Sequence, residues 1–480
     1  MDSASQNISI LEIFKIGIGP SSSHTMGPWK AASSFANTLV SGENPNDIDR
    51  IQVDLFGSLA LTGKGHGTDK AIIWGLTGCD PGTVGIEALP GILDEVEKNN
   101  QITLAGRFRT AFHPKESIVF HPNETLKFHP NGLRFQAFDS NENILRSKTY
   151  FSVGGGFVVE EGEELVFNEK PFPYPIEKAN DLKKYCDQDS SSIADVVYQN
   201  ELTLRSKDAL DHEILNLWEV MSTTIYQGCH SKGYLPGILK VSRRAQGIHS
   251  RLMGSIDYDN TKNEWLAALK AYQPAFDKVI KFVSCFAIAT NEENANFGRV
   301  VTAPTNGAAG VIPAVLMYFI CFSTKKDVKD RDIIDFLCVA GIIGSLFKKG
   351  ATISAAMGGC QAEIGVSSAM AAAALASGLG GTVDQSLMAA EIAMEHHLGL
   401  TCDPVQGLVQ IPCIERNSMG AIKAITAAEI ALESNPSLAK VSLDDVIRTM
   451  WKTACDMDVR YKETSLGGLA ANIAVSVPEC

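Results

Sequence analysis

Three of the eleven cysteines lie in segments where the chain could bind a cofactor. Cys360 is part of MGGCQAEIG, after two glycines and before an alanine-rich helix, where the helix N-terminus would favour a thiolate. Cys402 and Cys413 belong to TCDPVQGLVQIPC, a segment that two prolines and a glycine interrupt. No C-x₂-C or C-x₃-C spacing occurs, so the local motifs of zinc ribbons, thioredoxins and ferredoxins are absent.

Thiols on loops and at a helix start suit an iron–sulfur cluster that only three protein sulfurs hold. Such a cluster leaves one iron open, and an open iron is a Lewis acid that can turn a hydroxyl into a leaving group. The pattern therefore indicates a dehydration rather than electron transfer. The alternative is that these thiols are buried and behave as small hydrophobic side chains.

Three histidines are candidates for moving a proton. His24 follows three serines in GIGPSSSHTMGP, ahead of a predicted helix, and could be an acid or a base; the alternative is a helix cap with a surface histidine. His66 lies between glycines in LTGKGHGTDKA, an accessible position for a histidine that meets a ligand. His129 precedes a Pro-Asn-Gly turn, which it could simply decorate.

Two segments could bind a substrate carboxylate, because hydroxyl and free N–H groups at a helix start attract anions. TAPTNGAAGVIPAVL presents a polar turn ahead of an apolar helix, with helix capping by its asparagine as the alternative. LPGILKVSRRA offers basic side chains, which are commonly only a solvated helix face. The predicted substrate-binding residues are Ser21, Ser22, Ser23, Lys240, Thr305, Asn306 and Gly307.

The elements that must position these residues fall into two regions. Residues 50–56 alternate apolar and polar side chains like a half-buried strand, the Asn131-Gly132 pair predicts a hairpin between strands at 125–128 and 133–138, and 144–153 supplies another strand. Helices are predicted at 27–40 and 68–76. We expect a multi-domain protein: an N-terminal α+β domain at 1–160, a linker at 161–192, and a larger all-helical domain at 193–480.

Composition narrows the function classes. With 480 residues, 45% of them hydrophobic and 20% charged, the chain predicts two to four globular domains of ordinary composition. A formal charge of −13 argues against nucleic acid as a partner. The N-terminus fits no secretory signal and the apolar stretches near 308–322 and 366–380 are interpreted as buried helices, so we expect a cytoplasmic protein without a membrane partner.

Blocks along nearly the whole chain resemble one family, the iron–sulfur-dependent, pyridoxal-phosphate-independent L-serine dehydratases in their single-chain form. The blocks, in the family's order, are SSSHTMGP, GHGTD, FHPNG, SVGGGF, LPGILKVSRRA, APTNGAAGVIPAVL, GGCQAEIGVSSAMAA, CDPVQGLVQIPCIERN and YKETSLGG. The resemblance implies that L-serine is converted to pyruvate and ammonia. It also implies a 4Fe-4S cluster on Cys360, Cys402 and Cys413, a site containing the three histidines, an α+β part similar to an allosteric substrate-binding domain, and a homodimer.

The last residue, Cys480, carries a thiol and a free α-carboxylate in the relation that serine's hydroxyl and carboxylate have. We expect this tail to enter the site and give its sulfur to the open iron as a fourth ligand; the alternative is a frayed terminus with an idle thiol. Two other functions stay open. One is a pyridoxal-phosphate lyase with Lys240 as Schiff-base lysine and VGGGF as phosphate loop, and the other is a non-catalytic amino-acid sensor.

Overall fold

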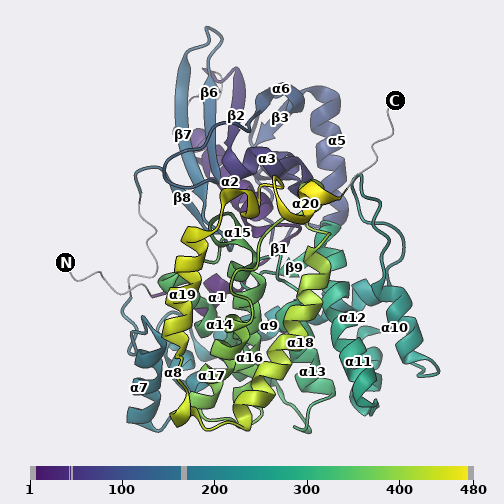
Figure 1. Cartoon of the computed structure of the whole chain (residues 1–480). Helices are drawn as coiled ribbons and strands as arrows, with labels where there is room; N and C mark the ends of the chain where they lie inside the picture. The colour runs from purple at the N-terminus through teal and green to yellow at the C-terminus, as the bar shows by residue number, and fades with distance from the viewer. Residues whose placement is uncertain (1–6, 43, 45–46, 164–169, 474–480) are drawn as a thin grey trace.

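A seven-stranded sheet forms the frame of the N-terminal region, at the top of Figure 1. The computed structural model describes residues 7–42, 44, 47–163 and 170–473. Strand β2 (Arg50–Phe56) is central: it pairs antiparallel with β6 (Gly132–Phe138) and parallel with β5 (Ile118–His121) and β4. The remaining strands are β3 (Gln101–Leu104), β4 (Phe108–Ala111), β7 (Ile144–Ser152) and β8 (Val158–Glu160). The strands predicted at 50–56 and 144–153 are thereby confirmed.

Helices α2 (Gly27–Gly42) and α4 (Thr68–Leu76) pack on one another and on this sheet. Phe35 of α2 stacks on Phe135 of β6 with ring centroids 5.2 Å apart. Both helices confirm the prediction, α4 to the residue. The other helices of this region are α3 (Gly57–His66), α5 (Leu89–Asn99) and α6 (Pro114–Ser117).

The hairpin predicted around Asn131-Gly132 is wrong. Residues 125–128 form no strand, and β6 pairs instead with β2 and with β7, which follows it after a short loop. Asn131 explains the difference, because its side-chain amide donates to the Ser152 carbonyl (3.2 Å) and its backbone N–H donates to His129 Nδ1 (3.1 Å). The loop before β6 therefore carries His129 toward the helical region rather than turning back into the sheet.

The C-terminal region is largely helical, as predicted. Its helices are α7 (Ala179–Asp189), α8 (Ile193–Leu202), α9 (Lys207–His230), α10 (Ala245–Met253), α11 (Lys262–Ala271), α12 (Phe276–Ala295), α13 (Val311–Cys321), α14 (Asp330–Gly350), α15 (Ala355–Gly358), α16 (Ile364–Gly378), α17 (Val383–Glu395), α18 (Cys413–Leu432), α19 (Leu443–Asp456) and α20 (Gly468–Asn472). Helix α7 lies within the range that composition predicts as a linker, and it packs on α8, α17 and α19.

Helix α16 is the centre of this region, and α13, α14, α17 and α18 surround it. Its side chains from Ile364 to Ala376 are all buried. Small residues allow the close approach: a Cβ on Gly420 of α18 would lie 2.8 Å from Ile364 Cγ2, and Ser368 Oγ donates to the Gly420 carbonyl at 2.9 Å. The alanine-rich tract is thus a helix-packing surface.

The start of the described chain belongs to the helical core. Ile8, Ile10 and Phe14, in and around α1 (Ile10–Ile13), are buried among helical side chains, and Ser9 Oγ donates to the buried Glu201 carboxylate (2.7 Å). Strand β1 (Ile16–Ile18) then pairs antiparallel with β9 (Arg299–Val301), a short strand that the all-helical prediction did not include. The two regions therefore share a core element.

Within the described ranges no single helix is long and apolar enough to cross a bilayer; the bent pair of α14 with residues 355–362 passes only when the two are taken together, by length and composition. The side chains of α14 from Phe336 to Phe347 are buried within the protein.

Candidate active site

Two of the predicted cluster cysteines face each other near the junction of the two regions. Cys360 lies in the short 3₁₀ turn Gly359–Ala362, ahead of α16, and Cys402 lies in the loop after α17. Their sulfurs and a carboxylate oxygen of Glu363 all lie within 4.8 Å of one another. Both thiols are buried, so the site is enclosed on this side.

Cys413 is the first residue of α18 and is also buried. One helical turn later, Arg416 Nη1 donates to Cys360 Sγ (3.4 Å) and Nη2 to Asp403 Oδ1 (2.8 Å). The Cys402 thiol, by hydrogen bonding, and the Arg416 guanidinium lower the pKa of Cys360. Burial raises the pKa of Cys413, and Arg416 opposes that rise. One guanidinium thus stabilises negative charge on two of the three sulfurs.

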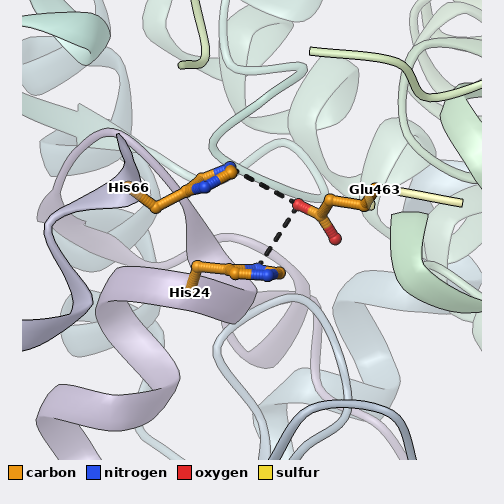
Figure 2. A group of neighbouring side chains, drawn as sticks. All are labelled: His24, His66 and Glu463. Carbon is orange, nitrogen blue, oxygen red and sulfur yellow. Dashed lines mark ion pairs between the residues drawn. The ribbon is translucent and has the colours of Figure 1, made fainter. Parts of the chain in front are cut away.

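The histidine pair lies on the other side of the junction (Figure 2). His24 belongs to the π-helical turn Ser22–Met26 that leads into α2, and His66 is the last residue of α3. Their rings stack with centroids 4.4 Å apart. Glu463, from the loop between α19 and α20, places Oε1 3.4 Å from His24 Nδ1 and 3.7 Å from His66 Nε2. All three side chains are buried, so the surface position considered for His24 is wrong.

Burial sets the protonation of these imidazoles. It lowers the pKa of His66 to about 4, and burial together with the charge of His66 lowers the pKa of His24 well below its ordinary value. Burial, with Lys348 nearby, lowers the pKa of His129 to about 4. All three rings are therefore neutral at pH 7, which is the form that can accept a proton.

Serine hydroxyls hold the histidine pair in place. Ser21 Oγ accepts from the backbone N–H of His24 (3.1 Å), so the predicted cap exists, and Ser23 Oγ lies 2.9 Å from His24 Nδ1. Ser22 is buried beside them in the same turn. Ser58, at the start of α3, places Oγ 3.0 Å from His24 Nε2. Two of the three predicted serines thus act on His24 directly.

Several buried polar atoms on the two sides of the junction have no hydrogen-bond partner among the described residues. They are His129 Nε2, Ser152 Oγ, Ser354 Oγ, Asn306 Oδ1 and Glu463 Oε2. Ser152 lies at the end of β7, and the loop that follows it contacts Ser354 through Gly154. Buried polar groups in native proteins are nearly always paired. Such a concentration is typical of a site that a polar ligand completes.

The turn Thr305–Gly307 contacts the thiol side of the site. A Cβ on Gly307 would lie 2.8 Å from Glu363 Oε2, so a larger residue here would displace that carboxyl group. Burial raises the pKa of Glu363 to about 7, against the effect of the Thr305 hydroxyl and Arg416. Asn306 donates to the Ile18 carbonyl (3.3 Å) and makes no side-chain cap for α13, so that alternative is wrong.

The basic segment before α10 lies apart from this turn. Lys240 is exposed on the loop between α9 and α10. The side chain of Arg243 is buried and forms ion pairs with Glu292 and Glu293. Arg244 is exposed and pairs with Glu415 at 2.7 Å, as expected of a solvated face. Cys480 lies outside the described residues.

The triple-glycine loop presents carbonyl groups, not N–H groups, to its charged neighbours. Lys15 Nζ donates to the Gly155 carbonyl (3.1 Å) and Lys30 Nζ to the Gly156 carbonyl (3.2 Å). All three glycines have positive φ. The hydrogen bonds of this loop therefore join β7 and β8 to the N-terminal segment and α2.

Sequence reasoning missed three charged residues of the site, Glu463, Glu363 and Arg416, and the hydroxyl groups of Ser58, Ser152 and Ser354. Glu463 lies within the block YKETSLGG, which the resemblance singled out without giving any residue of it a role. Arg416 could have been found from spacing, because residues three apart share a helix face and Arg416 is three after Cys413.

Comparison with known proteins covers both regions. Residues 9–163 match the serine dehydratase beta chain and residues 188–470 the serine dehydratase alpha chain. The chain is 46% identical over 472 residues to L-serine dehydratase 1 of Escherichia coli (strain K12), and 44% identical over 470 residues to L-serine dehydratase of Streptomyces coelicolor (strain ATCC BAA-471 / A3(2) / M145). Each comparison covers 97% of this chain and 99% of the relative. The chain therefore belongs to the serine dehydratase family, in the form that joins a beta part and an alpha part in one polypeptide.

Proposed function

We propose that this protein converts L-serine to pyruvate and ammonia. The observation that carries the proposal is the junction itself, where neutral, buried imidazoles lie on one side and buried thiols on the other. The relatives named L-serine dehydratase match the chain over nearly its whole length, on both sides of that junction.

The thiol side fits a 4Fe-4S cluster held by Cys360, Cys402 and Cys413. Two of the sulfurs are already within 4.8 Å of each other, and Arg416 supplies positive charge for thiolates. Sulfur is the ligand that iron–sulfur clusters require. When bound, the cluster supplies Lewis acidity for the β-hydroxyl of serine.

His66 is the better candidate for the base that takes the Cα proton. Its Nδ1 lies 2.8 Å from the Thr62 carbonyl, which can only accept, so the ring proton is on Nδ1 and Nε2 carries a lone pair. Both nitrogens of His24 already lie within 3.0 Å of serine hydroxyls. Loss of the Cα proton and the hydroxyl gives aminoacrylate, which water hydrolyses to pyruvate and ammonia.

The buried hydroxyls would bind the substrate carboxylate. Ser152 and Ser354 each keep an unpaired hydroxyl among the described residues, and the Thr305 hydroxyl lies beside the Glu363 carboxyl group. A carboxylate accepts hydrogen bonds from hydroxyl groups. His129 Nε2 provides one further unpaired atom in the same surroundings. Lys240 remains a predicted carboxylate partner, although its side chain is exposed.

Anaerobic reconstitution with iron and sulfide, followed by iron analysis and a pyruvate assay on L-serine, tests the proposal. We expect four irons per chain and pyruvate formation. An aldimine absorption band with activity in the absence of iron would instead support the pyridoxal-phosphate lyase, and serine binding without turnover would support the sensor. The homodimer stays a prediction, which light scattering of the reconstituted protein would check.

A further inference from the structure

Two imidazole nitrogens that carry lone pairs converge on the Glu463 carboxyl group. His66 contributes one: with its proton on Nδ1, the lone pair of Nε2 faces Glu463 Oε1 across 3.7 Å. A neutral imidazole nitrogen without a proton is an acceptor, and so is a carboxylate oxygen. The two atoms can therefore be joined only by a proton or by a ligand that donates to both.

His24 contributes a second acceptor. The Ser58 hydroxyl donates its only hydrogen to the Glu463 carbonyl (2.7 Å), so it must accept from His24 Nε2. The ring proton of His24 is then on Nε2, and Nδ1 accepts from the Ser23 hydroxyl at 2.9 Å. Nδ1 also lies 3.4 Å from Glu463 Oε1. Both imidazoles thus present acceptors to the same oxygen.

Glu463 is held rigidly in this position. Its backbone N–H donates to the Cys402 carbonyl (3.0 Å), its carbonyl accepts from Ser58, and its φ of 59° is in the left-handed region. The residue is 4% exposed, and Oε2 has no partner among the described residues. Burial, followed by the charges of Glu363 and Cys360, raises the pKa of Glu463 well above its ordinary value, and a ligand that brings positive charge and several donors would oppose that rise.

We propose that Glu463 binds the α-ammonium group of the substrate amino acid. The ammonium is a cation with three N–H donors, and Glu463 offers two carboxylate oxygens of which one is unused. Because Oε1 lies 3.7 Å from His66 Nε2, an amine bound to Glu463 brings its own α-carbon next to the predicted base. A metal ion fits less well, since the Ser23 hydroxyl already occupies His24 Nδ1. The inference rests on the proposed function for the identity of the substrate.

Two unreactive ligands can show whether Glu463 binds the amine itself or only supports the shape of the pocket. L-Alanine has the ammonium and carboxylate but no leaving hydroxyl, whereas 3-hydroxypropanoate has the hydroxyl and carboxylate but no amine. Calorimetric titration of the anaerobic holoenzyme would compare them in wild type and in Glu463→Gln. We expect the variant to bind L-alanine about 10- to 100-fold more weakly, as for loss of a buried hydrogen bond to a charged group, and 3-hydroxypropanoate within about threefold of wild type.

A matched control removes a buried carboxylate elsewhere. Glu391 of α17 is 5% exposed and has an unpaired oxygen among the described residues, and Glu391→Gln should leave both affinities unchanged. If Glu463→Gln fails to fold or to hold iron, Glu463→Asp keeps the charge. We expect Glu463→Asp to bind L-alanine at least threefold more weakly while 3-hydroxypropanoate is unaffected.

Equal weakening of both ligands would overturn the proposal, because Glu463 would then only support the pocket. Unchanged L-alanine binding in the variant, no L-alanine binding by wild type, or a divalent ion that co-purifies at this position and is lost in Glu463→Gln would also overturn it. None of these measurements needs turnover. A wild-type protein that binds L-alanine through Glu463 but makes no pyruvate would refute the proposed function alone.

Discussion

The histidine side and the thiol side of the junction differ in how well the protein alone stabilises their reactive groups. On the histidine side, Ser23, Ser58 and Thr62 fix both rings before any ligand arrives. On the thiol side, the hydrogen bond to Cys360 and burial raise the pKa of Cys402, and burial and the charge of Cys360 raise the pKa of Cys413. One side is preorganised by the fold, and the thiolates of the other would be stabilised by the cluster that we propose.

We expect the largest loss of activity when a thiol of the proposed cluster site is removed. Cys402→Ala is expected to abolish cluster assembly and pyruvate formation, because three ligands leave no redundancy. Iron and sulfide analysis after anaerobic reconstitution measures the first, and a pyruvate assay the second. Cys338→Ala, which removes an equally buried thiol on α14, should retain four irons. A Cys402→Ala protein with full iron content and activity would show that this thiol is not a ligand.

On the preorganised side, His66→Ala should lower kcat by about 10² to 10⁴-fold, the usual contribution of a general base. Exchange of the α-proton of L-serine with solvent deuterium should fall in parallel, while iron content stays at the wild-type level. His249→Gln is the control, since His249 is also buried and neutral but bonds to Trp265 far along the helical region. Undiminished exchange in His66→Ala would transfer the role to His24.

We expect a smaller loss of kcat/KM when the side chain that is removed only orients His24. Ser58→Ala removes the hydroxyl that joins His24 Nε2 to the Glu463 carbonyl, and should lower kcat/KM by about 5- to 30-fold, equivalent to a hydrogen bond or two. Ser386→Ala, which removes a buried hydroxyl on α17, should have no effect on kcat/KM. Equal losses in the two variants would mean that only stability has changed.

The smallest effect concerns pH. A base works only when unprotonated, so activity falls as the pH drops through its pKa; with the pKa of His66 lowered to about 4, that fall lies near pH 4. Between pH 8 and 5.5 we therefore expect kcat/KM to change by less than about twofold, whereas a histidine of ordinary pKa would lose about tenfold. Stopped assays across this range would measure the profile. A midpoint near pH 6.5 would contradict the assignment of a buried, neutral His66.

Sequence patterns predicted the local elements well and the long-range contacts poorly. The alternation at Ile51, Val53 and Leu55 fixed β2 because a buried face imposes a period of two. The hairpin that the Asn-Gly pair predicts does not form, because Asn131 donates its hydrogen bonds to Ser152 and His129. A turn preference is worth little against such tertiary contacts.

The same contrast between local patterns and long-range contacts holds for the residues of the candidate site. Cys360, Cys402 and Cys413 could be selected because thiols have few other uses in irregular segments, but Glu463 is an ordinary acidic residue in a polar stretch. It lies about 400 positions from His24 and His66, and no periodicity connects residues across such a separation. Only the fold brings that carboxylate to the two rings.

The pairing of β1 with β9 has a consequence for synthesis on the ribosome. Ile16 must wait for Val301, its partner about 285 positions later, which at typical elongation speeds takes roughly 15 to 60 seconds. The sheet of the N-terminal region can form during that delay, but β1 cannot reach its place until β9 has been made. An early segment of the chain is therefore packed late.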